Sequence, residues 1–198
     1  MYQNISEARD ALCHAGKMLA ARHWTPATSG NFSLRFGDEF LITRSGADKG
    51  QLSATDILRL DHSGKALDAP KSSAETDLHL HLYRLFENAN CVLHVHSLYA
   101  TAISMLHDQV HLSGYELLKA LPGIETHQVA IRIPVLPNSQ DMQDIMRSFN
   151  EVAGHETLCA YLIRGHGMYC WGNSIHETIR IIEALDFIFQ CQLLVQPR

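Results

Sequence analysis

Strand-like and helix-like segments alternate along the whole of this 198-residue chain, and the alternation is the strongest constraint on its fold. Apolar residues recur at intervals of three and four over 5–20, which predicts an opening helix. Short runs of branched and aromatic residues, typical of strands, lie between the helical segments. No repeat or low-complexity linker divides the chain. We therefore expect residues 1–198 to form a single α/β domain of layered sheet and helix.

The predicted elements follow one another with short turns between them. Strands are predicted at 32–36, 39–43, 57–61, 91–96, 129–136, 158–164 and 168–172. Further helices are predicted at 74–86, 97–106, 114–121, 139–149 and 174–194. Ser97 and Ser139 are expected to cap two of these helices, because a serine hydroxyl can accept a hydrogen bond from a free backbone N–H.

Composition excludes several classes of protein. A net charge of −5 and an isoelectric point near 6.2 argue against a surface that binds nucleic acid. No apolar run approaches the roughly 20 residues of a membrane helix, and the polar start MYQNISEARD is unlike a secretory signal. We expect a cytoplasmic protein with no membrane partner. The cysteines are far apart and expected to be free, mostly buried thiols: Cys13, Cys91, Cys159, Cys170 and Cys191.

Two histidines in one predicted strand are the main candidates for metal ligands. Side chains two residues apart in a strand point to the same side, so His94 and His96 would form a clamp. His79 and His81 have the same spacing in a predicted helix, where that step rotates by about 200° and separates them. Two half-buried, hydrogen-bonded histidines without a metal are the alternative interpretation of the strand pair.

A third candidate ligand lies in a tight turn. His166 stands between Gly165 and Gly167, and glycines allow the backbone to approach a site closely. Catalytic zinc commonly takes three protein ligands and keeps one position open. An ordinary turn without a ligand is the alternative interpretation of this segment.

Three clusters of glycine and small polar residues stand near the ends of predicted strands. They are TSGN at 28–31, TRSG at 43–46 and KSS at 71–73. Such loops present backbone N–H groups and hydroxyls to a phosphate, although each cluster alone could be a solvent-exposed turn. The chain lacks G-x-x-x-x-G-K-[ST] and G-x-G-x-x-G, so a small phosphorylated metabolite fits better than a nucleotide.

Two glutamates are candidates for moving a proton. Glu75 follows the last small-residue cluster, and Glu116 lies about twenty residues after the histidine strand. A carboxylate near a metal-bound carbonyl can take the neighbouring carbon-bound proton and return it elsewhere. Either residue could instead be a solvated helix residue, and the pattern alone does not decide between them.

TSGNFS, HVHS and RGHG, taken in this order, resemble the motifs of the class II (zinc-dependent) aldolase family. The resemblance covers nearly the whole chain. It implies a three-layer α/β/α sandwich with a central, mainly antiparallel sheet, and one zinc per subunit on His94, His96 and His166. It also implies Glu116 as the catalytic acid/base and a homotetramer with sites near the subunit boundaries.

The resemblance further implies a pocket for a small phosphorylated sugar. The pocket would be lined by residues of the three clusters: Ser29, Gly30, Asn31, Ser45, Gly46, Ser72 and Ser73. Glu75 is assigned to the same pocket with its role open, since aldolases carry a glutamate at the matching position and some dehydratases a cysteine.

GYELLKAL followed by PNSQD resembles dehydratase members of the family. An aldolase or epimerase acting on a fuculose- or ribulose-type phosphate is the alternative. A non-catalytic member of the family is disfavoured because every ligand position is filled.

Overall fold

The computed structural model describes residues 2–68, 75–153 and 158–195. Eight strands form one sheet: β1 (Asn31–Phe36), β2 (Glu39–Thr43), β3 (Ile57–Leu60), β4 (Cys91–Val95), β5 (Gln109–Ser113), β6 (Ala130–Leu136), β7 (Ala160–Ile163) and β8 (Gly167–Gly172). Their order is β3-β2-β1-β4-β8-β7-β6-β5, and β6–β7 is the parallel pair among otherwise antiparallel neighbours. The predicted mainly antiparallel sheet is confirmed.

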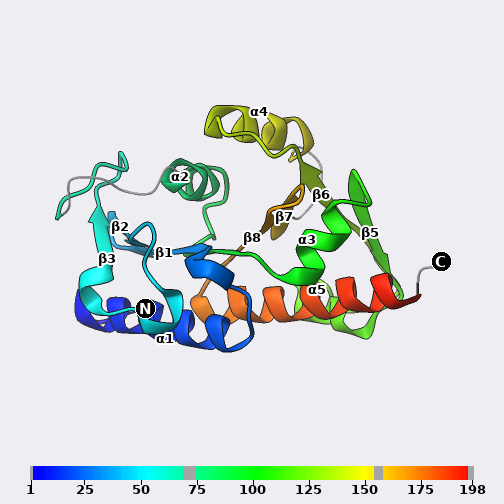
Figure 1. The fold of residues 1–198 in the computed structure, drawn as a ribbon, viewed down its shortest axis with the longest axis horizontal. Coiled ribbons are helices and arrows are strands. Elements are labelled where there is room, and N and C mark those ends of the chain that lie inside the picture. Colours follow the sequence, from blue (N-terminus) through cyan, green and yellow to red (C-terminus); the bar gives the residue numbers. More distant parts are fainter. Residues whose placement is uncertain (1, 69–74, 154–157, 196–198) are drawn as a thin grey trace.

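Helices cover both faces of the sheet. They are α1 (Ile5–Ala21), α2 (Thr76–Leu85), α3 (Leu98–Ser104), α4 (Met142–Val152) and α5 (Ile175–Val195). Figure 1 shows α2 and α4 on one side of the sheet and α1 and α5 on the other, which is the predicted three-layer sandwich. None of the helices in the described ranges combines the length and apolar character needed to cross a membrane.

Four short 3₁₀ helices complete the described elements. They are η1 (Pro26–Thr28), η2 (Lys49–Gln51), η3 (Ala54–Asp56) and η4 (Glu116–Ala120). The segment predicted as a helix at 114–121 is therefore a 3₁₀ helix, and strand β5 was not predicted. Ser97 caps α3 as expected, whereas the cap of α4 is Asp141 and not Ser139, because the Asp141 carboxylate accepts the backbone N–H of Gln143.

Alternation along the strands divides the core into two parts. Leu93 and Val95 of β4 face the cluster under α1, α3 and α5, while Val92 faces the cluster under α2 and α4. Because side chains alternate along a strand, His94 shares the side of Val92. The five cysteines are free, and four of them are buried, as expected from the sequence.

Strand register sets three polar side chains in one row. Asn31 of β1 pairs with His94 of β4, and His94 pairs with Tyr169 of β8. Residues that are directly opposite in neighbouring strands point to the same face of a sheet. The row therefore lies on the face covered by α2, in the middle of the sheet.

Candidate metal centre

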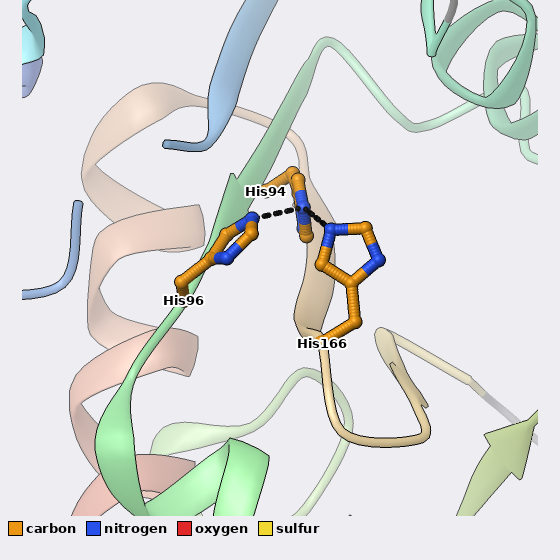
Figure 2. A group of neighbouring side chains, drawn as sticks. All are labelled: His94, His96 and His166. Carbon is orange, nitrogen blue, oxygen red and sulfur yellow. Dashed lines mark hydrogen bonds between the residues drawn. The ribbon is translucent and has the colours of Figure 1, made fainter. Parts of the chain in front are cut away.

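Three imidazoles converge at the end of β4. Nε2 of His94 lies 2.9 Å from Nε2 of His96 and 3.3 Å from Nε2 of His166. Figure 2 shows the rings of His96 and His166 turned toward His94 from two sides. One ligand atom from each residue lies within 4.8 Å of the other two. The structure thus brings together the predicted clamp of His94 and His96 and the third candidate ligand, His166.

The His94 ring is held in one orientation by two contacts. Nδ1 donates to the backbone carbonyl of Met168 at 3.0 Å, so the lone pair of the neutral ring is on Nε2. The ring also stacks on Tyr169, with centroids 4.1 Å apart and planes 11° apart. Tyr169 stacks in turn on Tyr161 at 4.9 Å. All three rings are buried, so close packing restricts the His94 side chain to one rotamer. In this rotamer Nε2 faces the site.

Glycines place His166, as the sequence suggested. Gly165 has a φ of +63°, a conformation that disfavours other residues. A side chain at Gly167 would place its Cβ 2.3 Å from the carbonyl oxygen of Val95, so only glycine allows this approach to β4. The hydroxyl of Thr101 on α3 donates to the carbonyl of His166 at 3.1 Å and fixes the turn from the other side.

The donor set fits zinc. An ion about 2.0–2.1 Å from each nitrogen of a tetrahedral site sets those nitrogens about 3.3 Å apart, close to the two separations from His94. Burial lowers the pKa of His94 well below its usual value and, with the neighbouring His166, lowers that of His96 to about 4. Neutral imidazoles are the form that binds a metal, so His94 and His96 need no deprotonation at neutral pH.

Glu75 lies against two of the same histidines, His94 and His166. Its Oε2 is 3.7 Å from Nε2 of His94, and its Oε1 is 3.7 Å from Nε2 of His166. Burial by itself raises the pKa of this carboxyl, but His94 and hydrogen bonds from Asn31 and Tyr169 outweigh it and lower the pKa to about 2. The Tyr169 hydroxyl donates to Oε2 at 2.9 Å. The structure therefore offers a fixed carboxylate beside the metal ligands.

The TSGN loop packs directly on the clamp. Gly30 has a φ of +78°, and a Cβ there would lie 2.6 Å from the carbonyl oxygen of His94. The buried Ser29 hydroxyl and the Thr76 hydroxyl at the start of α2 have no hydrogen-bond partner among the described residues. Hydroxyls left without partners are suited to a polar ligand, since a buried polar group without a hydrogen bond is costly.

The other predicted site residues lie away from the three histidines or outside the described residues. Ser45 and Gly46 lie in an exposed turn after β2, and Ser72 and Ser73 lie outside the described residues. Glu116 has a side chain that is 71 % exposed and is paired with Lys119 and His127. Within the described ranges, no hydrogen bond or ion pair joins Glu116 to the three histidines.

Lys49 is a site residue that the sequence patterns did not reveal. It is 1 % exposed, and its ammonium donates to the carbonyls of Thr28 at 2.8 Å and Ala47 at 2.7 Å. Burial lowers the pKa of this lysine, while the carboxylates of Asp48 and Glu75 partly offset that effect. Lys49 thereby joins the TSGN loop to the loop after β2. A single lysine in a polar turn gives no sequence signal for such a role.

Comparison with known proteins agrees with this geometry. Residues 10–193 match the family described as Class II Aldolase and Adducin N-terminal domain. The layered fold and a cluster of three histidines that could hold a metal ion are consistent with that family. The chain belongs to the class II aldolase family.

Relatives and solved structures extend the match to nearly the full length. The chain is 45 % identical over 194 residues to a methylthioribulose-1-phosphate dehydratase of Stenotrophomonas maltophilia, covering 96 % of this chain and 91 % of the relative. A dehydratase of the same name from Methylococcus capsulatus is 45 % identical over 196 residues, covering 97 % and 96 %. L-fuculose-1-phosphate aldolase from Thermus thermophilus superposes with a TM-score of 0.77 at 25 % identity, covering 96 % and 95 %. YgbL from Escherichia coli has the same fold, with a TM-score of 0.81 at 23 % identity and coverage of 98 % and 91 %.

Replacing Lys49 with Met should destabilise the protein, because two carbonyl groups lose charged donors worth about 1.5–3 kcal/mol each. The substitution also removes the cost of burying the Lys49 charge, which offsets part of this loss of stability. We expect the free energy of unfolding, measured by urea denaturation, to fall by about 2 kcal/mol. Lys17→Met on the exposed face of α1 is the matched control and should change it by less than about 0.5 kcal/mol. Equal stability of the two variants would contradict the bridging role.

Proposed function

We propose that this chain removes water from 5-methylthioribulose 1-phosphate to give 2,3-diketo-5-methylthiopentyl 1-phosphate, a step of methionine salvage. The observation that carries the proposal is 45 % identity over 96 % of the chain to an enzyme named for that dehydration. The three-histidine cluster supports it, because the chemistry needs an electrophile at a ketone. We also propose a cytoplasmic location, which dispersed free thiols support.

One zinc per subunit is proposed on His94, His96 and His166. When bound, zinc supplies a Lewis acid that stabilises negative charge on the substrate's carbonyl oxygen. The chain's own contribution at His94 is to keep the ring neutral by burial and to aim it through the Met168 carbonyl and the stacked Tyr169. Imidazole ligands also suit other transition metals, so the preference for zinc is part of the proposal.

The phosphate is proposed to bind at the small-residue loops. The Ser29 hydroxyl is available for it, and Lys49 holds the TSGN loop and the loop with Ser45 and Gly46 together. Asn31, Ser72 and Ser73 are included in this pocket on the resemblance to the family. Holding the phosphate there would orient the carbon chain of the substrate toward Glu75 and the histidines.

Two carboxylates have separate proposed roles in the reaction. Glu116 takes the proton from C3 of the open-chain ketose and then returns a proton to the C4 hydroxyl, which leaves as water. The resulting enol rearranges to the diketone, so the reaction loses one water molecule and needs no oxidant. Glu75, held ionised by Asn31 and Tyr169, accepts a hydrogen bond from a substrate hydroxyl and orients it.

The exposed position of Glu116 favours an acid/base that acts in the site of a second copy of the chain. Its side chain is 71 % exposed in one chain. Exposed apolar residues lie next to the histidines, since α3 begins just after His96 and carries Leu98, which is 72 % exposed, with Met105 at its end, 60 % exposed. A partner that covers this surface in a tetramer could bring Glu116 of the partner subunit to the metal centre.

An aldolase or epimerase acting on a fuculose- or ribulose-type phosphate is the second candidate. The position of Glu75 favours it, because aldolases of the family use a glutamate at the matching position and this carboxylate lies 3.7 Å from two of the histidines. The fold does not separate these reactions, since each begins from a polarised ketone.

The test of the proposed function is a substrate comparison. Purified, zinc-loaded protein is incubated separately with methylthioribulose 1-phosphate, fuculose 1-phosphate and ribulose phosphate. We expect turnover of the first to the diketone, detected by its absorbance and mass, with loss of activity after chelation and recovery with zinc. Cleavage or epimerisation of the other sugars, with no dehydration of the first, would establish the second candidate instead.

Mixed oligomers test the origin of the acid/base. Glu116→Gln and His94→Ala should each lower kcat by about 10²-fold or more when expressed alone. Co-expression of the two variants with different tags should restore a measurable part of the activity, because a site with intact histidines then receives an intact Glu116 from its neighbour.

The matched control pairs Glu75→Gln with His94→Ala. Glu75 and the histidines contact one another within one chain, so no mixed oligomer of these two variants contains a complete site. This pair should stay inactive. If the Glu116→Gln and His94→Ala pair also stays inactive although mixed oligomers form, Glu116 does not act across the subunit boundary.

A further inference from the structure

A chain of buried side-chain hydrogen bonds runs from α2 through β1 to the carboxylate at the metal centre. The Tyr83 hydroxyl lies 2.8 Å from Oγ of Ser33, and Oγ of Ser33 lies 2.6 Å from Nδ1 of His79. Nε2 of His79 bonds Oδ1 of Asn31, and Nδ2 of Asn31 bonds Oε2 of Glu75. Four linked contacts therefore connect Tyr83 with Glu75.

The chemistry of these groups fixes the direction of every donor. An ionised Glu75 only accepts, so Asn31 donates through Nδ2 and accepts through Oδ1. Nε2 of His79 must then carry the hydrogen, which leaves a lone pair on Nδ1. That lone pair takes the Ser33 hydroxyl as donor, and Ser33 accepts from Tyr83. A single arrangement of hydrogens thus satisfies all five groups.

Packing holds these hydrogen-bonded side chains in this arrangement. His79 and Ser33 are each 1 % exposed, and Tyr83 is 4 % exposed. Asn31 and Ser33 share a face of β1, and His79 and Tyr83 are four residues apart on α2, the helix that covers that face. Burial lowers the pKa of His79 to about 3, so the ring is neutral at neutral pH.

We propose that His79 is a positioning residue of the metal centre: as the Nε2–H tautomer it orients the Asn31 amide, so that Nδ2 holds the Glu75 carboxylate beside His94 and His166. The wrong amide orientation would present Oδ1 of Asn31 to Glu75 and repel it. His79 touches neither the histidine cluster's ligand atoms nor, in this proposal, the substrate. Its hydrogen bond toward the centre goes to Asn31, and its ring also meets Tyr169 edge-on, with centroids 5.6 Å apart.

The first test measures the tautomer and needs no substrate. Nuclear magnetic resonance of protein with isotope-labelled histidine distinguishes Nε2–H, Nδ1–H and charged rings. We expect His79, assigned by the signal missing in His79→Gln, to be neutral and Nε2-protonated with and without zinc. A ring protonated on Nδ1, or charged at neutral pH, would overturn the proposal.

The second test measures catalysis and rests on the proposed dehydratase activity. His79→Leu removes the donor to Asn31 and should lower kcat by about 10–100-fold with little change in KM and full zinc content. His79→Gln keeps an amide donor near the position of Nε2 and should retain kcat within about threefold. His81→Leu is the control on the same helix, since His81 bonds Asn150 away from the site, and should resemble the wild type.

These outcomes separate the proposal from its alternatives. A merely structural role predicts equal impairment of His79→Leu and His79→Gln, which would overturn the positioning role. Unchanged kcat in His79→Leu would also overturn it. If His79→Leu fails to fold, the kinetics of His79→Gln and the tautomer decide. If the wild type dehydrates no substrate, the proposed function fails while the tautomer measurement still tests the hydrogen-bond chain.

Discussion

The antiparallel pairing of β4 with β1 and β8 is the constraint on which the centre depends. It sets Asn31, His94 and Tyr169 side by side on one face of the sheet. His96 follows directly after the strand, with its ring centroid 4.7 Å from that of His94. A shift of register by one residue would turn His94 toward the opposite core and leave an imidazole among apolar side chains. The apolar residues that alternate with His94 therefore keep this histidine on the side of the candidate metal centre.

Burial and charge act together at this centre. The buried imidazoles of His94 and His96 resist protonation, so they remain ready to bind a cation, while Glu75 stays ionised because Asn31 and Tyr169 donate hydrogen bonds to it. A divalent ion placed among three neutral rings would gain from a carboxylate at this distance. Lys49 adds a positive charge on the side where the loops predicted to bind phosphate meet. The three histidines could thus hold a cation, and the loops joined by Lys49 are the proposed place for an anion.

Local patterns in the sequence predicted most helices and strands and the histidine pair, because strand alternation and helix periodicity are properties of neighbouring residues. Strand β5 was not predicted from the sequence, because Val110 and Leu112 are its two buried apolar residues. An alternation of two residues is too short to recognise. The positions of Glu75 and Lys49 could not be predicted from local patterns, because they depend on contacts with residues distant in the sequence. Glycine spacing suggested His166, but its approach to His94 depends on the packing of Gly167 against Val95, which no local pattern contains.

The central claim is that one zinc is bound by the three histidines, and X-ray absorption at the zinc edge of the purified protein tests it most directly. Three imidazole nitrogens at about 2.0–2.1 Å, with the remaining position filled by oxygen, are the predicted shell. Sulfur ligands, or fewer than three imidazoles in the wild type, would contradict the account. So would an unchanged shell in His94→Ala, because Nε2 of His94 lies within 3.3 Å of Nε2 of each of the other two histidines.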